Sequence, residues 1–402
     1  MTFNFMPRRP DTLSLDRRQF LAAALASALA GRVFARESPK IYTAAIIGHT
    51  GRGDYGHAVD QIFTDRDDVQ LLAVADPIAE GRARAMQRSK ALRQYENYRE
   101  MLAKEKPQLV GIAPRWTDQR REMALAAIAT GAHIYTEKPF ATDLIEADEI
   151  LAAAAKTKRK IAVAHQVRLA PGILHLKKSI DDGLIGDLLQ VDAWGKQDQR
   201  AGGEDMLVLG THLFDLVRFF AGNPISCTAR VQEKGKDITA DSGRPAGEQI
   251  GPIAGDEINA QFAFPNSIQG TFTSRGKLRP VIGHWGLLLT GTKGSARILM
   301  DIFPNIFVAK TTPWAKDGKT EKWERLPGDP TLNATEDQKT AAPANRRVVD
   351  DWIDAIQKDR QPICSGQAAT AAIEMAMAVY QSAISARRVE FPLANRRHPL
   401  AK

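Results

Sequence analysis

The chain has very little cysteine: only Cys227 and Cys364 occur among its 402 residues. Two thiols form one bridge at most, which excludes a scaffold built on disulfides and leaves open whether these two pair. Neither lies in a C-x-x-C motif and the histidines form no closely spaced pair, so no metal site is expected. Long hydrophobic runs are missing too, because no segment reaches the roughly 18 apolar residues of a membrane-spanning helix.

Positive charge is not concentrated as a nucleic-acid-binding surface would require. The sequence has 55 basic and 47 acidic residues, a formal net charge of +8, part of which lies within residues 1–35. The longest basic cluster elsewhere, KTKRK at 156–160, has no aromatic residues among its charges, so we expect no nucleic-acid partner. A composition of 44% hydrophobic and 25% charged residues is typical of globular proteins and excludes a disordered chain.

The first residues have the three parts of an export signal. Arg17 and Arg18 precede an uncharged stretch at 20–31, and small residues with A-x-A-like cleavage sites follow. Twelve residues rise only about 18 Å as a helix, too little to span a membrane. The RRQFL sequence at 17–21 resembles the twin-arginine motif, whereas the alternative, an amphipathic helix, would need a polar face that LAAALASALA lacks. We therefore expect a twin-arginine signal peptide over 1–35, its export machinery as a partner and a periplasmic protein.

After this segment, strand and helix patterns alternate. Short apolar segments predict buried strands at 41–48, 71–76, 108–113, 133–137 and 160–164. Helices are predicted between them, from about 54 and at about 79–92, 118–130 and 142–156. This alternation is typical of βαβ units in a parallel sheet with both faces covered. We predict an α/β domain over 40–165.

The sequence pattern changes near residue 187 to an α+β domain. Strand-like segments follow one another with few helices between them: LLQVDAW, TARVQE, EINAQFAF, QGTFTS, WGLLLTG and ARILMD. Two amphipathic helices then close the chain, the first carrying Val348, Val349, Trp352, Ile353 and Ile356 on one face. We assign residues 166–393, these helices included, to a second domain with a mainly antiparallel sheet.

A glycine-rich turn, GHTGRGDYG at 48–56, follows the first strand. Such a turn lets the backbone approach the pyrophosphate of a dinucleotide at the start of the next helix. Two registers fit the G-x-G-x-x-G pattern: Gly51, Gly53 and Gly56, or Gly48, Thr50 and Gly53. We favour the second, because the first glycine belongs at the corner between strand and loop. The alternative is a glycine-rich loop of some other doubly wound protein.

An aspartate, Asp76, ends the second strand and bears on cofactor choice. A carboxylate there accepts hydrogen bonds from the adenosine ribose and repels a 2′-phosphate, so NAD is favoured. Arg82 and Arg84 lie near enough in sequence to keep NADP possible.

Several motifs in order resemble the Gfo/Idh/MocA family, which includes glucose-fructose oxidoreductase and inositol dehydrogenase. They are the glycine turn, AVADP at 73–77, EKP at 137–139, RLAPGI at 168–173, G-x-H-x-x-D at 210–215 and the ending at 380–393. The resemblance covers about 41–393 and implies a Rossmann domain followed by an open-faced sheet domain, with cofactor and substrate meeting between them. Expected cofactor-binding residues are Gly48, Thr50, Gly51, Arg52, Gly53, Asp76, Pro114, Glu137 and Lys138.

The resemblance also implies catalytic roles. Oxidising a sugar hydroxyl requires a group that takes its proton, and the family places a lysine, here Lys138, beside the nicotinamide. His212 aligns with the family's catalytic histidine, and Asp215, one helical turn on, is expected to orient it. Several family members have an aspartate where this chain has Val208, and the expected substitute is Asp205 or its neighbour Glu204, if the loop bends.

A second departure is Arg115-Trp116-Thr117-Asp118 after Pro114, in place of the family's histidine-containing turn. Candidate substrate contacts are His165, Arg168, Lys196, Asp198 and Arg200. The GKQDQRAGGED segment at 195–205 is equally consistent with a solvated loop.

The leading interpretation is an exported NAD(P)-dependent oxidoreductase that acts on a sugar, sugar acid or cyclitol. Since no free nicotinamide pool is expected outside the cytoplasm, the cofactor should be held tightly and recycled. Two alternatives remain: a glycoside-cleaving enzyme that oxidises its sugar transiently, and a catalytically silent carbohydrate-binding protein. A homo-oligomer, dimer or tetramer, is expected through the open sheet face.

Overall fold

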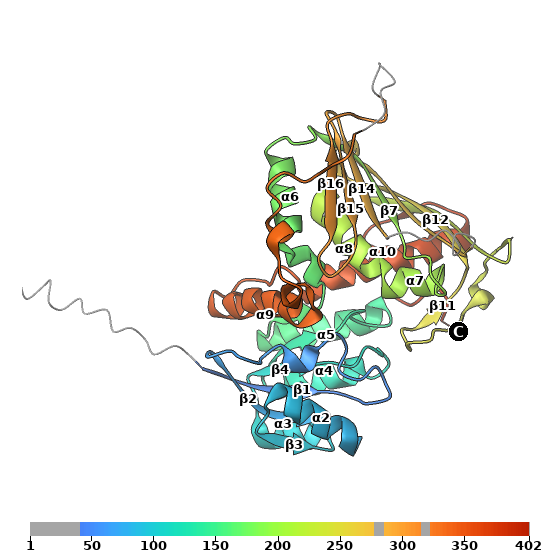
Figure 1. Ribbon diagram of the computed structural model, residues 1–402. Coiled ribbons are helices and arrows are strands. Elements are labelled where there is room, and N and C mark those ends of the chain that lie inside the picture. Colours follow the sequence, from blue (N-terminus) through green and yellow to red (C-terminus); the bar gives the residue numbers. More distant parts are fainter. Residues whose placement is uncertain (1–40, 277–284, 315–321, 402) are drawn as a thin grey trace, which may run out of the picture. The chain divides into compact units, whose positions relative to one another are not determined.

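The computed structural model describes residues 41–276, 285–314 and 322–401 (Figure 1). The expected signal peptide lies outside the described residues. From Tyr42 onward the chain forms one contact unit.

The first sheet has six parallel strands in the order β3-β2-β1-β4-β5-β6. They are β1 (Tyr42–Ile47), β2 (Val69–Ala75), β3 (Arg93–Tyr95), β4 (Leu109–Ile112), β5 (His133–Thr136) and β6 (Ile161–Val163). Every residue of β4, β5 and β6 is buried, as expected for apolar strands covered on both faces. The strand order reverses between β1 and β4, which creates a crevice at their carboxyl ends where ligands of such folds bind.

Helices from two distant parts of the sequence cover this sheet. Those between its strands are α2 (Ala79–Ser89), α3 (Tyr98–Glu105), α4 (Arg120–Ala129) and α5 (Leu144–Thr157). The helix α9 (Ala341–Gln357) packs against β6. Its Trp352 is fully buried with ring centroids 6.5 Å from Phe63 and 6.1 Å from Tyr135. The apolar face predicted for α9 therefore stabilises the first sheet.

The prediction of a helix from about residue 54 is wrong. The chain there forms turns and a short 3-10 helix, η1 (Val59–Gln61). Asp54 and Ala58 have φ angles of 51° and 60°, in the left-handed region that an α-helix excludes. The glycine turn therefore has no α-helix dipole directly behind it, and any anion there must be bound by the loop itself.

The second sheet has ten strands along the path β17-β16-β15-β14-β7-β13-β12-β8-β18, with β9 pairing β8. Their bounds are β7 (Leu188–Trp194), β8 (Ser226–Glu233), β9 (Lys236–Asp237), β12 (Glu257–Ala263), β13 (Gln269–Arg275), β14 (Gly286–Gly291), β15 (Ser295–Leu299), β16 (Asn305–Ala309), β17 (Glu324–Arg325) and β18 (Val389–Glu390). Among these described strands only β7 and β13 pair in parallel. The expected α/β fold with a second, mainly antiparallel sheet is confirmed.

One face of this second sheet is covered by α8 (Gly210–Ala221) and α10 (Gly366–Ser385). Phe214 of α8 packs on Phe262 and Phe272, with ring centroids 5.8 and 4.9 Å away. Along β12 the alternate residues Asn259 and Gln261 are exposed, so the opposite face is open. The remaining elements are η2 (Gln166–Leu169), α6 (Pro171–Asp181), α7 (Gly203–Val208), η3 (Ala240–Ser242), β10 (Arg244–Pro245), β11 (Pro252–Ile253), η4 (Pro265–Ser267), η6 (Pro330–Asn333) and η7 (Asp337–Lys339).

The two thiols, Cys227 and Cys364, are both buried and free. Among the described helices, none is long and apolar enough to cross a membrane. Within the same residues no group of three or more His, Cys, Asp or Glu side chains could hold a metal ion.

Candidate active site

The glycine turn begins at Gly48, directly after β1. The Gly48 amide donates to Ala75 O at 2.8 Å, and a Cβ there would lie 2.2 Å from the Tyr55 ring. Gly48 thus occupies the corner that the favoured register gives it. Gly51 has a φ of 82° and nothing lies within 4 Å of where its Cβ would be. The loop backbone at Gly51 is therefore open to close approach by a ligand.

Asp76 braces this loop against the end of β2. Its Oδ2 accepts from the Thr50 amide at 3.0 Å and the Thr50 hydroxyl at 2.8 Å, and its Oδ1 accepts from the Ile78 amide at 2.9 Å. Both carboxylate oxygens already have protein donors. Asp76 therefore positions the glycine loop, a role that the sequence did not reveal, besides lining the pocket described next.

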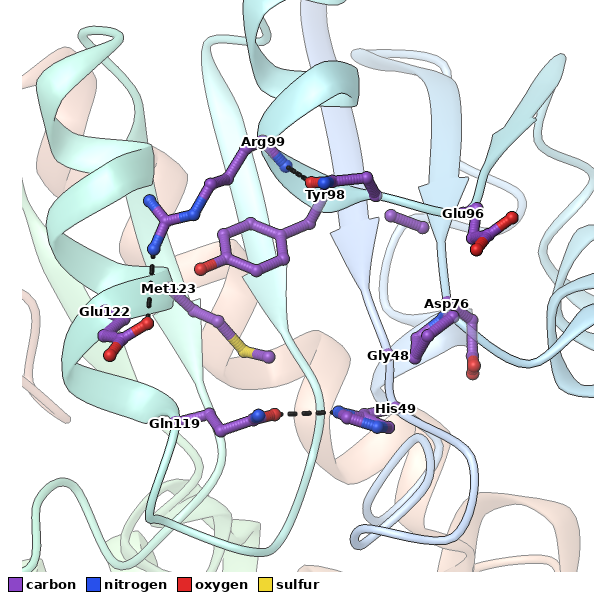
Figure 2. Close-up of a pocket in the computed structure, with 12 residues that line it drawn as sticks. Gly48, His49, Asp76, Glu96, Tyr98, Arg99, Gln119, Glu122 and Met123 are labelled. Carbon is purple, nitrogen blue, oxygen red and sulfur yellow. Dashed lines mark hydrogen bonds and ion pairs between the residues drawn. The ribbon is translucent and has the colours of Figure 1, made fainter.

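A pocket of about 360 Å³ lies at the carboxyl ends of β1 and β2 (Figure 2). Tyr98, Met123 and Gln119, which the sequence did not single out, line it together with Asp76 and His49. An ion pair between Arg99 and Glu122 at 3.2 Å borders it. An aromatic ring, a thioether and a carboxylate suit the adenine and ribose of a dinucleotide, and the volume fits that half of the molecule.

A second loop, Pro114–Gln119, follows β4 and meets the glycine loop. The Arg115 amide donates to Gly53 O at 3.2 Å, and His49 Nδ1 lies 2.8 Å from Gln119 Oε1. Arg52 forms an ion pair with Asp118, and its guanidinium carbon lies 5.0 Å from the centre of the Trp116 ring.

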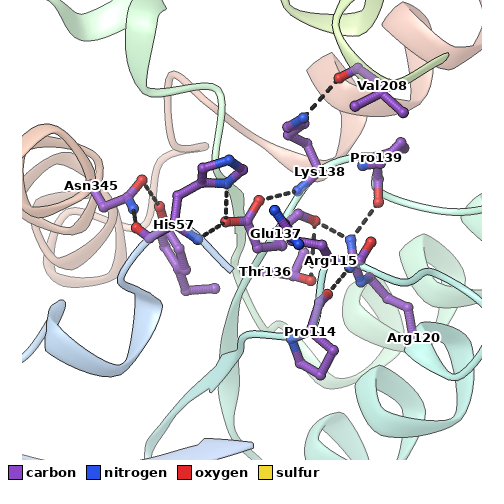
Figure 3. A network of polar contacts seen from close by, with 11 residues as sticks. His57, Pro114, Arg115, Arg120, Thr136, Glu137, Lys138, Pro139, Val208 and Asn345 are labelled. Atoms are coloured by element: carbon purple, nitrogen blue, oxygen red, sulfur yellow. Dashed lines mark hydrogen bonds and ion pairs between the residues drawn. The ribbon is translucent and has the colours of Figure 1, made fainter. Parts of the chain in front are cut away.

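A buried arginine, Arg120, joins the loops after β4 and β5 (Figure 3). The Arg120 guanidinium is 1% exposed and donates to the carbonyl oxygens of Pro114, Glu137 and Pro139. Burial lowers the pKa of Arg120 to about 10, so it stays charged at neutral pH. Two of the three carbonyls flank Lys138 in sequence. Arg120 therefore holds the backbone from which Lys138 projects.

The neighbouring carboxylate, Glu137, is paired with His57. Glu137 Oε1 accepts from the His57 amide at 2.8 Å and lies 2.8 Å from His57 Nδ1. Burial alone would raise the pKa of Glu137, but the charge and hydrogen bonds of His57 and the ammonium of Lys138 lower it to about 2. Asn345 of α9 holds the backbone of His57, since its Nδ2 donates to His57 O at 2.7 Å. The Asn345 Oδ1 in turn accepts from the Tyr135 hydroxyl.

Lys138 is 5% exposed, and its Nζ donates to the backbone carbonyl of Val208 at 2.7 Å (Figure 3). Val208 lacks the carboxylate that several family members have at this position, but its backbone carbonyl still binds Lys138. Burial lowers the pKa of Lys138. The positive charges of Arg200 and Arg115 lower this pKa further, whereas the negative charge of Glu137 raises it. Such a lysine loses its proton more readily than an exposed one.

His212, in the first turn of α8, lies near Lys138 and His165. It is 7% exposed, and its ring centroid lies 5.3 Å from that of His165 and 6.1 Å from that of Trp285. Burial holds the pKa of His212 well below its usual value, and the charge of Lys138 lowers it further. The imidazole is therefore neutral, and its buried Nδ1 has no hydrogen-bond partner among the described residues. It is a candidate proton acceptor.

Two expected contacts of this site are corrected by the structure. Asp215 binds the Arg168 guanidinium, and its Oδ1 lies 3.7 Å from His165 Nδ1, so it does not orient His212. Arg168 comes from η2, and its positive charge attracts the buried Asp215 carboxylate. This ion pair, and not the one-turn spacing on α8, decides which group Asp215 binds. Asp205 accepts from the amides of Lys196 and Gln197 and from the Ser274 hydroxyl, which makes it an anchor for the loop after β7 rather than a substitute partner for Lys138.

The remaining candidate substrate contacts lie together in that anchored loop. Arg200 Nε donates to Asp198 Oδ1 at 3.0 Å, and Lys196 Nζ lies 3.8 Å from Asp198 Oδ2. The charge of Arg200 acts on Lys138, which places this cluster at the same site. The charges of Arg200 and Asp198 are paired, while Lys196 and Gln199 are exposed, so the loop is partly paired and partly solvated.

Two models of the Gfo/Idh/MocA oxidoreductase family match this chain. One, described as an NAD-binding Rossmann fold, matches residues 42–165, and the other, described as a C-terminal alpha/beta domain, matches residues 177–391. Inositol 2-dehydrogenase of Gluconacetobacter diazotrophicus is 26% identical over 65% of this chain and 67% of its own length. D-apiose dehydrogenase of Paraburkholderia graminis is 24% identical over 82% of this chain and 84% of its own length.

Solved structures of similar fold include levoglucosan dehydrogenase in complex with NADH and levoglucosan. It has a TM-score of 0.69 and 19% identity, and the match covers 88% of this chain and all of that one. An oxidoreductase of Agrobacterium radiobacter in complex with NAD+, L-tartaric acid and magnesium has a TM-score of 0.64 and 18% identity over 87% and 98% of the two chains. At these identities the likeness shows the fold.

The Glu137–His57 pair predicts a specific acid sensitivity. Because the folded-state pKa of Glu137, about 2, lies below the ordinary glutamate value of 4.5, the stability that its ionised form contributes is nearly complete above pH 4.5 and is lost as pH falls toward 2. Glu137→Gln removes it. The stability gap between wild type and variant should therefore shrink by roughly 2 kcal/mol from about pH 5 to about pH 3 in denaturant titrations.

Glu149→Gln, which removes half of the exposed Arg121–Glu149 pair, is the control and should show little such change. If the stability difference between wild type and Glu137→Gln did not vary with pH, Glu137 would not be an ionised, paired carboxylate in the folded protein.

Proposed function

Because this chain belongs to the Gfo/Idh/MocA family of oxidoreductases, with an NAD-binding Rossmann domain, we propose that it transfers hydride between NAD and a hydroxyl-bearing carbon of a sugar, sugar acid or cyclitol. Relatives named inositol 2-dehydrogenase and D-apiose dehydrogenase support this substrate class. They favour a dehydrogenase over a glycoside-cleaving enzyme or a silent carbohydrate-binding protein.

The observation that carries the proposal is the buried pair of nitrogen bases, Lys138 and His212, beyond the carboxyl end of β5. Burial lowers both pKa values, so near neutral pH a larger fraction of each group is unprotonated, which is the form that can accept a proton. A polyol hydroxyl must lose its proton as its carbon gives up hydride. Trp285 and the Arg200 cluster provide an aromatic face and polar groups for orienting such a substrate.

The residues that would hold the dinucleotide fit it. Gly48 and Gly51 give the loop a backbone that a pyrophosphate can approach, and the pocket beside Asp76 suits the adenosine. When bound, the nicotinamide supplies the carbon that accepts the hydride. NADP is less compatible, since the Asp76 carboxylate at the pocket repels a 2′-phosphate.

The contact with Val208 decides how the two bases work together. A backbone carbonyl accepts the Lys138 hydrogen bond and fixes its Nζ, but it cannot pass a proton on to His212 as a carboxylate could. We propose that Lys138 takes the one proton that the hydroxyl releases, and that His212, as a neutral imidazole, orients the substrate through a separate hydrogen bond.

Single and double variants test this division. Lys138→Met should slow single-turnover hydride transfer by roughly 10²–10⁴ with NAD still bound, as expected for loss of a positioned acid–base group. His212→Asn should slow it as well, and the two losses should multiply in the double variant. Lys104→Met, an exposed lysine on α3, is the control. Full activity of Lys138→Met would exclude the lysine, and a double variant no slower than the poorer single one would mean one shared relay.

Export remains a proposal that rests on residues 14–35 alone. A twin-arginine substrate crosses the membrane folded, which suits a protein that must bind its nucleotide in the cytoplasm and recycle it outside. We predict that Arg17→Lys with Arg18→Lys keeps the full-length protein in the cytoplasm, as judged by fractionation. A double variant that still reaches the periplasm would contradict this route.

Self-association through the open face of the second sheet is likewise proposed. A shallow groove of about 390 Å³ runs over this face, lined by Thr228, Ala229, Arg230, Asn259, Ala260, Gln261, Thr271 and Thr273. Hydrogen-bonding side chains on a broad sheet face that no other described residues cover suit a second copy of the same face. A monomer mass by light scattering would contradict it.

A further inference from the structure

Three side chains join the glycine loop to the loop after β4. Arg52 comes from the first loop, Trp116 and Asp118 from the second; we refer to them as the latch. The Arg52 guanidinium pairs with the Asp118 carboxylate and lies over the Trp116 ring at 5.0 Å. The backbones also touch, because a Cβ at Gly53 would lie 2.4 Å from Arg115 N. Only a glycine at that position lets the loops meet so closely.

The latch lies on the path that a bound dinucleotide must take. The adenosine pocket is at the ends of β1 and β2, and Lys138 follows β5. In the strand order β3-β2-β1-β4-β5-β6, the ends of β1 and β4 lie between these two sites. The pyrophosphate has to cross there, which is where the two loops are joined.

We infer that Arg52, Trp116 and Asp118 form a latch that sets how fast the dinucleotide enters and leaves. The inference rests on the proposed function, since it presupposes that the crevice binds NAD. The side chains of Arg52 and Asp118 are 37% and 31% exposed, so their contact can open without unfolding the core. With the latch closed, the loops obstruct exchange in both directions. This chain thereby has a means of slowing the loss of its bound cofactor.

A different role for Arg52 makes an opposite prediction. If Arg52 only bound the pyrophosphate, Asp118 would compete with the phosphates for the same guanidinium. Removing the Asp118 charge would then free Arg52 and strengthen cofactor binding. In a latch, Arg52 and Asp118 are equal partners, and loss of either one opens it.

The experiment measures association and dissociation rates of NADH by stopped-flow nicotinamide fluorescence, with no substrate present. Asp118→Asn keeps the side-chain shape and removes its charge, and Arg52→Met removes the cation. Each should raise both rate constants by about tenfold, equivalent to about 1.4 kcal/mol in the exchange barrier, with a much smaller change in Kd. Arg121→Met, which breaks the exposed pair with Glu149 on α4 and α5, is the matched control and should leave both rates unchanged.

Other results overturn the latch. Slower dissociation in Asp118→Asn would assign Arg52 to the phosphates, and unchanged rates in both variants would show that the contact does not obstruct exchange. An equal effect of Arg121→Met would make the change a general consequence of lost surface charge. Wild-type protein that binds no NADH would overturn the proposed function itself, and the latch with it.

Discussion

The site depends on one buried guanidinium. Arg120 binds the carbonyls of Pro114, Glu137 and Pro139, which come from the loops after two neighbouring parallel strands. A planar group with five N–H donors in fixed directions can hold several carbonyls at once, which an ammonium cannot do with the same geometry. Without it three backbone oxygens would lose a donor, at a cost of about 1–3 kcal/mol for each that stays buried. Arg120 thereby fixes the backbone on both sides of Lys138.

Around Arg120, burial decides which groups are charged. Glu137 stays ionised because His57 pairs with it, and Asn345 of α9 keeps His57 in place from far along the sequence. Lys138 and His212 have no carboxylate hydrogen-bonded to them among the described residues, and burial lowers both pKa values. Near the carboxyl end of β5 the site thus contains an anion held by its partner, Glu137, and two groups without such a partner, Lys138 and His212 of α8.

The sequence predicted those features that are local. The parallel strands and the corner glycine Gly48 follow from runs and spacings of a few residues, whereas the EKP motif at 137–139 was identified by its resemblance to the family. Arg120 was missed because an arginine at the start of a helix usually faces solvent, and no neighbouring residue signals the carbonyls it binds. Asn345 was missed for a related reason, since its partner His57 is 288 residues away.

The incorrect expectations have the same origin. Asp215 was assigned to His212 from helical spacing, but Arg168 reaches it from a different element and binds its carboxylate. The helix expected after the glycine turn does not form because Asp54 and Ala58 adopt left-handed angles, which nothing in their residue types requires. Tertiary contacts decided these positions, and a single sequence contains little information about them.

The central claim is that the site at the carboxyl ends of the first sheet's strands oxidises a polyol with NAD. It is tested most directly by the near-ultraviolet absorbance of reduced nicotinamide after NAD-loaded protein is mixed with a set of sugars, sugar acids and cyclitols. The account predicts that members of this set reduce the bound cofactor in a single turnover. Protein that retains NAD, yet shows no reduction with any of these polyols, would contradict it.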